Sequence, residues 1–173
     1  EYNYAAYLTA ILDNLNDVVV TIDTSGTIIT ANKTMSTIFG YEPDEIMGQD
    51  VSILMPDPYA KYHSEFLNHY LETGRAKIIG VGRELPGLHK SGRVFPIELS
   101  LSEVVQEGQR QFIGIVKDIT ERKKAMEEIY KTAYFDDLTE LPNMRSFEID
   151  LARVLNQASS QFNALDIYCC LID

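Results

Sequence analysis

The stretch Met55-Pro-Asp-Pro-Tyr-Ala-Lys-Tyr-His63-Ser-Glu-Phe-Leu-Asn-His69-Tyr70 decides the fold of the region around it. Proline fixes φ near the helical value and leaves no unpaired N–H in a first turn, so the two prolines predict a helix that begins near Asp57 and ends at Gly74. Aromatic and apolar residues recur along it at helical spacing and predict a stripe that faces an interior: Tyr59, His63, Phe66, Leu67 and Tyr70.

His63 lies in the middle of this stripe and has two interpretations. It is a core histidine hydrogen-bonded to a neighbour, or it is an axial ligand to haem iron. A haem ligand requires a neutral imidazole, an apolar slot, and cationic groups for the two propionates. His69, Arg75 and Lys77 follow closely and provide such groups. Periodicity alone does not decide between the two interpretations.

The composition bounds the class of protein. The chain has 173 residues, of which 45% are hydrophobic and 24% charged, as in a soluble globular domain. Its net charge of −11 makes it a poor general binder of nucleic acid or of an anionic membrane. Cys169 and Cys170 are adjacent and have no third partner, which argues against a disulfide framework or a zinc site and favours a reducing, cytoplasmic location.

The sequence contains no apolar stretch near the ~18 residues that cross a bilayer, so we expect no membrane segment within it. It begins without methionine, and we therefore expect an excised piece whose upstream anchoring stays open. Residues 4–15 have helical periodicity and predict an amphipathic helix. Five β-rich stretches follow, which begin near residues 18, 27, 78, 93 and 111. Asn32 is expected to cap a short helix between the second and third strands.

The first two predicted strands are separated from the last three by helices, which indicates an α+β fold with an antiparallel sheet. We expect four segments: an N-terminal helix (1–16), a domain (17–120), a connector helix (121–134) and the start of a second domain (135–173). The connector has a thin apolar stripe, typical either of a two-helix coiled coil or of a solvated helix. We expect a homodimer through the N-terminal and connector helices. A helix over 144–155 and a strand over 167–173 open the second domain.

Several motifs in this order resemble a PAS sensor domain. They span about residues 8–121 and comprise Asp23-Thr-Ser-Gly-Thr-Ile-Ile-Thr-Ala-Asn32, Phe39-Gly-Tyr41, Gly48-Gln49, Lys90-Ser-Gly-Arg-Val-Phe-Pro96 and Asp118-Ile-Thr-Glu121. The resemblance implies the PAS fold, a five-stranded antiparallel sheet with flanking helices.

Within that family, a second set of motifs is most similar to the haem-binding oxygen sensors of the FixL type: Ile53-Leu-Met-Pro, Pro58-Tyr59, His63, Tyr70, Gly74, Ile78-Ile-Gly and Gly82-Arg83. By resemblance, His63 is the proximal ligand to the iron of haem b, and Arg83 is the distal arginine that hydrogen-bonds O2. Ile78, Leu99 and Leu101 match the apolar distal wall, and Tyr70 belongs to the same pocket.

The sequence also departs from that pattern. His69 stands where an arginine beside a propionate is common, so Lys77 is the remaining candidate counter-ion. Val81 stands where related phosphodiesterase sensors have a distal methionine, which favours five-coordinate ferrous haem. Val51 stands where flavin-binding light sensors need a cysteine, so no flavin adduct forms there.

The C-terminal part resembles the opening of a GGDEF domain, the fold of diguanylate cyclases. Phe135-Asp-Asp-Leu-Thr-Glu-Leu-Pro-Asn143 covers its first motif, with Glu140 where glycine is usual. Leu171-Ile-Asp173 resembles the first core strand, whose aspartate binds Mg²⁺ in active cyclases. The Gly-Gly-Asp-Glu-Phe string is absent from these 173 residues, so the resemblance implies no enzyme activity here and a GTP-dependent cyclase in the intact parent.

The leading expectation is therefore a haem-based sensor of O2 or another diatomic gas that regulates cyclic di-GMP production. The alternative is a haem-free PAS module for dimerisation, with an empty pocket or a small apolar ligand, in the same signalling protein.

Overall fold

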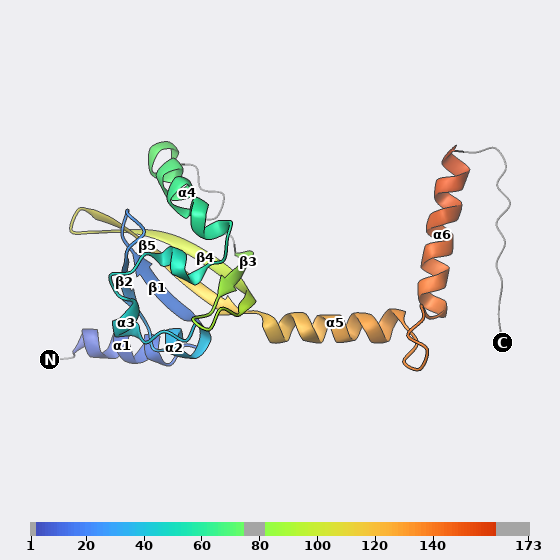
Figure 1. Cartoon of the computed structure of the whole chain (residues 1–173), viewed down its shortest axis with the longest axis horizontal. Helices are drawn as coiled ribbons and strands as arrows, with labels where there is room; N and C mark the ends of the chain where they lie inside the picture. Colours follow the sequence, from blue (N-terminus) through green and yellow to red (C-terminus); the bar gives the residue numbers. More distant parts are fainter. Residues whose placement is uncertain (1–2, 75–81, 162–173) are drawn as a thin grey trace. The chain divides into compact units, whose positions relative to one another are not determined.

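Figure 1 shows the computed structural model of the chain, which describes residues 3–74 and 82–161, with side chains as far as Asn156. It divides into two compact units, Glu1–Glu121 and Arg122–Asp173. The first unit is built on a five-stranded antiparallel sheet in the order β2-β1-β5-β4-β3, which confirms the predicted fold class. The strands are β1 (Val18–Ile22), β2 (Ile28–Ala31), β3 (Arg83–Leu88), β4 (Val94–Gln106) and β5 (Gln109–Asp118).

Tight turns join the strands where the sequence has turn-forming residues. Between β1 and β2, the Asp23 carboxylate accepts hydrogen bonds from the backbone N–H groups of Ser25 and Thr27, and Gly26 has φ 89°. Between β4 and β5, Glu107 and Gly108 both have positive φ, as a two-residue hairpin loop of the twist-compatible kind requires. The turns thereby fix the registers of these two hairpins.

The register of β4 on β5 sets which residues point to the inner face of the sheet. Ile97, Leu99, Leu101 and Glu103 alternate along β4 and lie opposite residues of β5 from Asp118 to Phe112. Because side chains alternate between the faces of a sheet, these four residues share a face with buried Phe112 and Val116. The inner-face residues of β4 thus continue from three apolar side chains to the carboxylate of Glu103.

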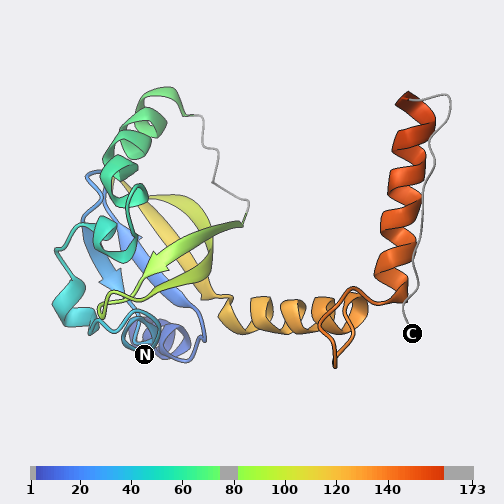
Figure 2. The ribbon, with the colours of Figure 1, turned by 45° about the vertical axis from the view of Figure 1, so that its right-hand side comes forward.

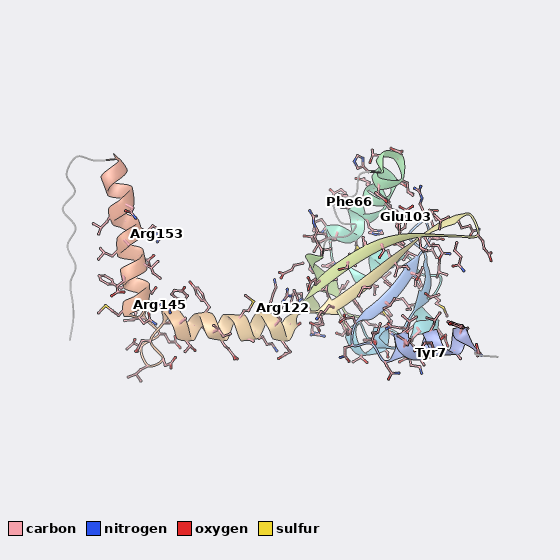
Figure 3. All side chains as sticks on the ribbon, turned by 180° about the vertical axis from the view of Figure 1, so that it is seen from behind. Tyr7, Phe66, Glu103, Arg122, Arg145 and Arg153 are labelled. Carbon is pink, nitrogen blue, oxygen red and sulfur yellow. The ribbon has the colours of Figure 1, made fainter. Side chains whose placement is uncertain are left out.

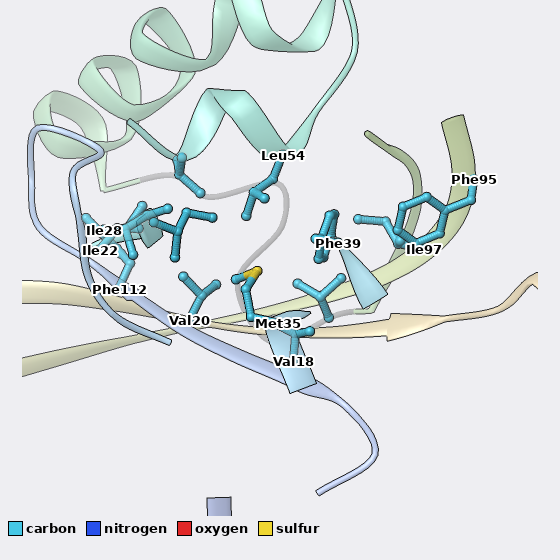
Figure 4. Packing of buried hydrophobic residues seen from close by; sticks show 13 residues of the cluster. Val18, Val20, Ile22, Ile28, Met35, Phe39, Leu54, Phe95, Ile97 and Phe112 are labelled. Carbon is cyan, nitrogen blue, oxygen red and sulfur yellow. The ribbon is translucent and has the colours of Figure 1, made fainter. Parts of the chain in front are cut away.

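Three short helices cover the inner face and close the core: α2 (Thr34–Ile38), α3 (Pro43–Ile46) and the 3₁₀ helix η1 (Val51–Leu54). Figure 4 shows Met35 and Leu54 packed over Val18 and Val20 of β1, while Phe39 packs against Phe95 and Ile97. Phe39 and Met35 are completely buried. Apolar burial is therefore continuous from β2 to β4.

Asn32 does not cap α2 with its side chain, contrary to the sequence-based prediction. Its side-chain oxygen accepts a hydrogen bond from Val19 N–H at 3.0 Å, and its amide donates to the carbonyls of Leu12 and Asp17 at 2.8 and 3.0 Å. Only 6% of Asn32 is exposed. The reason is that unpaired backbone groups at the entry to β1 need partners, and a buried amide supplies one acceptor and two donors.

The helix α4 (Tyr59–Thr73) follows its sequence-based boundaries closely and ends at Gly74, which adopts the left-handed conformation at φ 62°. The predicted interior stripe is only partly right. Leu67, Tyr70 and Leu71 pack against the core, whereas Phe66 is 62% exposed and Tyr59 is 40% exposed. Successive residues are turned by about 100° around the helix axis, so Phe66 and Tyr59 lie at the edge of a helix face centred on Leu67. The buried face of α4 is therefore rotated relative to the predicted stripe.

The predicted strand from residue 78 lies partly outside the described residues, which resume at Gly82. The strand β3 begins at Arg83 and extends through Pro86 to Leu88, farther than predicted. Proline is tolerated there because β3 is the edge strand and needs no hydrogen bonds on its outer side.

The N-terminal helix α1 (Tyr4–Asp13) has no buried residue, and its apolar side chains are largely exposed. Within the first unit, Figures 1 and 2 both place α1 and α4 at opposite ends. No helix in the described ranges is both long and apolar enough for a membrane span.

The second unit contains most of α5 (Thr120–Tyr134) and all of α6 (Met144–Gln161). Met126 and Ile129 on α5 are 64% and 69% exposed. In the loop between the helices, the Asp136 carboxylate accepts hydrogen bonds from the N–H groups of Leu138 and Thr139, and the Asn143 side chain accepts one from Ser146 N–H at the start of α6. The predicted strand over 167–173 lies outside the described residues.

Asn32→Ala should lower the free energy of unfolding by about 2 kcal/mol, because it leaves one buried N–H and two carbonyls without their partner. Urea unfolding followed by circular dichroism measures the change. Asn68→Ala on the exposed side of α4 is the matched control and should stay within about 0.5 kcal/mol of the wild type. Equal losses in the two variants would show that the Asn32 hydrogen bonds do not stabilise the unit.

Candidate functional site

His63 lies half-buried on α4, beside the turn that joins β1 and β2. A Cβ atom built on Gly26 would lie 3.7 Å from the Nδ1 and Cε1 atoms of the His63 ring, and 3.7 Å from Oδ2 of Asp50. The Nδ1 edge of the imidazole therefore faces the Gly26 turn and the Asp50 carboxylate. Glycine suits this position because of its positive φ, and it also keeps the space beside the ring open.

Burial lowers the pKa of His63, and the nearby Asp50 carboxylate opposes this shift without cancelling it. The imidazole is thus held neutral at neutral pH. Neutral imidazole is the form that coordinates metal ions, because its unprotonated nitrogen has a free lone pair.

Asp50 is itself held in place by the backbone. Its Oδ1 accepts a hydrogen bond from Ser52 N–H at 2.8 Å, which caps the start of η1. The neighbouring Val51 N–H donates to the Gly26 carbonyl at 2.9 Å, so η1 and the β1–β2 turn are tied together. The Asp50 carboxylate is thereby held near enough to His63 for its charge to act on the imidazole.

The strands contribute an apolar wall on the inner face. Leu99 is paired with Val116 and Leu101 with Gly114. A Cβ on Gly114 would lie 3.3 Å from Val20, 3.5 Å from Leu99 and 3.6 Å from Leu101, so these three side chains gather over the glycine. The wall is therefore lined by aliphatic groups. Because Gly114 has no side chain, these groups can lie close to the backbone of β5.

Arg83 is the first residue of β3 and is paired with Leu99. The alternation of β3, in which Gly87 is buried opposite Phe95, places Arg83 on the inner face as well. Its side chain is exposed. The structure thus brings Arg83, Leu99 and Leu101 to one face of the sheet, while their roles as a distal arginine and an apolar wall stay predictions.

Tyr70 faces the sheet, and its hydroxyl group has a specific partner there. It donates a hydrogen bond to Oε2 of Glu103 at 2.5 Å, and its ring lies edge-on to Phe112 with centroids 5.6 Å apart. The hydrogen bond to the Glu103 carboxylate raises the pKa of Tyr70 above its ordinary value. Tyr70 therefore links α4 to β4 and β5.

The remaining predicted site residues are placed less closely. His69 is exposed on α4, and Lys77, Ile78 and Asp173 lie outside the described residues. Within the described ranges, no three histidine, cysteine or acidic side chains cluster as a metal site would require. A haem ligand needs no such cluster, because the porphyrin supplies four of the nitrogens that bind iron.

Sequence reasoning missed Glu103, Asp50 and Gly26 as neighbours of the site. Glu103 had a detectable signal, since it follows Leu99 and Leu101 at the two-residue period of the inner face. Asp50 and Gly26 had none, because their closeness to His63 depends on how the loops fold over the sheet.

This fold, an antiparallel sheet with helices gathered over its inner face, is that of a small sensory domain. The PAS fold family model matches residues 6–119, and the chain belongs to the PAS family.

Known proteins agree with this assignment. The chain is 39% identical over 110 residues to a probable serine/threonine-protein kinase of Dictyostelium discoideum, covering 64% of this chain and 7% of that protein. It is 32% identical over 152 residues to the sensor protein FixL of Bradyrhizobium diazoefficiens, covering 87% of this chain and 30% of FixL. The chain therefore spans less than a third of either protein.

Among solved structures, the chain resembles the PAS domain of a Colwellia psychrerythraea protein with a TM-score of 0.57 and 26% identity, over 69% of this chain and all of that one. The first unit is thus a PAS sensory domain of the kind found in signalling proteins.

Tyr70→Phe should lower the free energy of unfolding by about 1 kcal/mol at pH 8, because it removes one hydrogen bond to a carboxylate. The Tyr70 pKa is raised on folding, so this contribution is complete below the unfolded value of about 10 and is lost as the pH rises through the folded pKa. The gap between wild type and variant, measured by urea unfolding, should close at strongly alkaline pH.

Glu103→Met provides the control for this pH dependence, since it removes the acceptor while keeping the phenol. In that background Tyr70→Phe should have little effect at any pH. A gap that stays constant from pH 8 upwards would contradict the assigned hydrogen bond.

Proposed function

We propose that the chain is the sensory part of a haem-based receptor for O2 or another diatomic gas. The observation that carries the proposal is the half-buried His63 imidazole, kept neutral by burial and set on a helix that packs over the inner face of the sheet. On that face the leucines Leu99 and Leu101 present an apolar wall and Arg83 presents a cation. These are the groups that haem requires from a protein.

The residues fit the cofactor in kind. His63 would hold the iron, with Asp50 near its Nδ1 edge, and the two leucines would contact the porphyrin face. His69 is exposed on the same helix and, with Lys77, would lie towards the propionates. When bound, the haem would supply the iron at which a diatomic gas is recognised.

Arg83 would act on the gas and not on the haem. Its guanidinium group carries five N–H donors in a rigid fork, and its position at the start of β3 leaves it exposed on the inner face. Hydrogen bonding from this group would favour O2, a better acceptor than CO. Ile78, whose structure is outside the described residues, would add to the apolar wall.

For signalling, gas binding has to favour one arrangement of the connector over another, with a differential free energy of typically ~1–3 kcal/mol. We propose that the output is a diguanylate cyclase domain, which begins at Phe135 and in the intact parent would use GTP and Mg²⁺, with Asp173 as a metal ligand. The resemblance of Phe135–Asn143 to a GGDEF opening supports this proposal. A homodimer through α1 and α5 would suit such an output, because both helices expose apolar residues.

A second candidate is a haem-free PAS module that serves dimerisation or binds a small apolar ligand. The position of the His63 ring beside the Gly26 turn favours it, because a core histidine packs in the same way. The two candidates differ in whether the His63 imidazole coordinates a haem iron or contacts protein groups alone.

The absorption spectrum of protein expressed with haem supplied separates them. The wild type should show a strong Soret band that shifts on adding CO, and His63→Ala should lose most of it and regain it with added imidazole. His89→Ala, in the turn between β3 and β4, is the matched control and should keep the band. An unchanged band in His63→Ala, or no band in any of the proteins, would refute the haem proposal.

Arg83→Ala should weaken O2 affinity about tenfold, which corresponds to ~1.4 kcal/mol for a charge-assisted hydrogen bond, and should change CO affinity much less. Stopped-flow measurements of the association and dissociation rates of haem-loaded protein give both affinities. Arg93→Ala, which removes an arginine stacked over Phe95 on the β3–β4 side of the sheet, is the control. Parallel changes for O2 and CO in Arg83→Ala would argue against its assigned role.

A further inference from the structure

Three side chains from three elements meet at the hairpin end of the sheet: Tyr70 of α4, Glu103 of β4 and Arg110 of β5. The Glu103 carboxylate accepts a hydrogen bond from the Tyr70 hydroxyl at 2.5 Å through one oxygen, and it pairs with Arg110 Nε at 2.8 Å through the other. We call this the Glu103 cluster. Figure 3 labels Glu103 on the sheet and Phe66 on the α4 helix.

Glu103 occupies a position that would otherwise be apolar. It follows Ile97, Leu99 and Leu101 on the inner face and lies opposite Phe112. Its side chain is 24% exposed, so much of its hydration is replaced by the two protein partners. A carboxylate with both oxygens engaged by charged or short hydrogen bonds holds its partners in defined directions.

The α4 helix depends on this cluster because its apolar packing is thin. The helix has no fully buried residue, and Phe66 and Tyr62 are 62% and 42% exposed. Elements with little buried apolar surface belong to the least stable part of a fold and open locally before the core does. A specific polar contact therefore has a large share in fixing where such a helix lies.

The cluster also contacts the strand that leads out of the domain. Arg110 and Phe112 belong to β5, which ends at Asp118. The Asp118 carboxylate accepts a hydrogen bond from Thr120 N–H at 2.8 Å at the start of α5, and Ile119 is buried and bonded to the Pro96 carbonyl. A displacement of β5 would thus reach the first turn of the connector helix.

We propose that Glu103 is a positioning residue: it fixes α4, and with it His63, against the β4–β5 hairpin, and it transmits a displacement of α4 to β5 and the start of α5. The positioning half stands on the hydrogen bond and the ion pair of the Glu103 cluster. The transmission half rests on the proposed gas-sensing function, because it needs a signal that acts on α4.

Hydrogen–deuterium exchange on the full 173-residue chain tests the positioning half without haem. Tyr70→Phe should raise amide exchange across residues 63–73 about fivefold and leave β1 unchanged. Tyr62→Phe makes the same chemical change on the same helix, away from Glu103, and should behave as the wild type. In a Glu103→Met background, Tyr70→Phe should add less than twofold.

Unchanged α4 exchange in Tyr70→Phe, or an equal increase in Tyr62→Phe, would overturn the positioning role. Should Glu103→Met fail to fold, the comparison of the two tyrosine variants decides the matter by itself, because each change is confined to one hydroxyl group.

The transmission half is tested on haem-loaded protein with and without CO. Binding of CO should change amide exchange in residues 120–134 of the wild type and of Tyr62→Phe, and this response, scaled to the amount of CO-bound haem in each sample, should fall at least threefold in Tyr70→Phe. A full response in Tyr70→Phe would overturn transmission through the cluster. Failure of the protein to load haem would overturn the proposed function and transmission together, while the apo-protein exchange still decides positioning.

Discussion

The pairing of β5 with both β1 and β4 is the constraint on which the rest of the structure depends. As the central strand, β5 fixes the registers on both sides of the sheet, and a shift by one residue would turn every inner residue outward. That register places Leu99, Leu101 and Glu103 on one face of the sheet, where Glu103 meets Tyr70 of α4. It also sets the position of Asp118 at the end of β5, whose carboxylate accepts a hydrogen bond from Thr120 N–H at the start of the connector helix.

The candidate site combines a rigid half with a loosely held half. The sheet and the turn around Gly26 and Asp50 are tied by backbone hydrogen bonds, whereas α4 contributes His63 from a helix without a fully buried residue. Such a division suits a sensor, because a ligand can change the position of the weakly packed element at little cost while the sheet retains its form. The Glu103 cluster lies at the junction of the two halves.

Most of the fold was predictable from local sequence signals. The turn residues near Gly26, Gly74 and Gly92 marked element ends correctly, because a left-handed backbone conformation selects glycine whatever the tertiary context. Periodicity identified α4 but not which of its faces is buried. Apolar residues on neighbouring faces, such as Phe66 and Leu67, fit the helical spacing equally well, and only packing against the core distinguishes them. Asn32 was misjudged and Glu103 was missed because the partners that decide their roles, Val19 and Tyr70, lie 13 and 33 residues away, respectively, on other elements. The roles of His63 and Arg83 stay predictions, as do those of Lys77, Ile78 and Asp173.

A crystal structure of haem-loaded protein, with anomalous diffraction recorded at the iron absorption edge, tests the central claim most directly. The account predicts one strong iron peak between α4 and the inner face of the sheet, within bonding distance of the His63 imidazole. An iron peak beside His69 or His89, or a space over Leu99 and Leu101 filled by another ligand or closed by side chains, would contradict it.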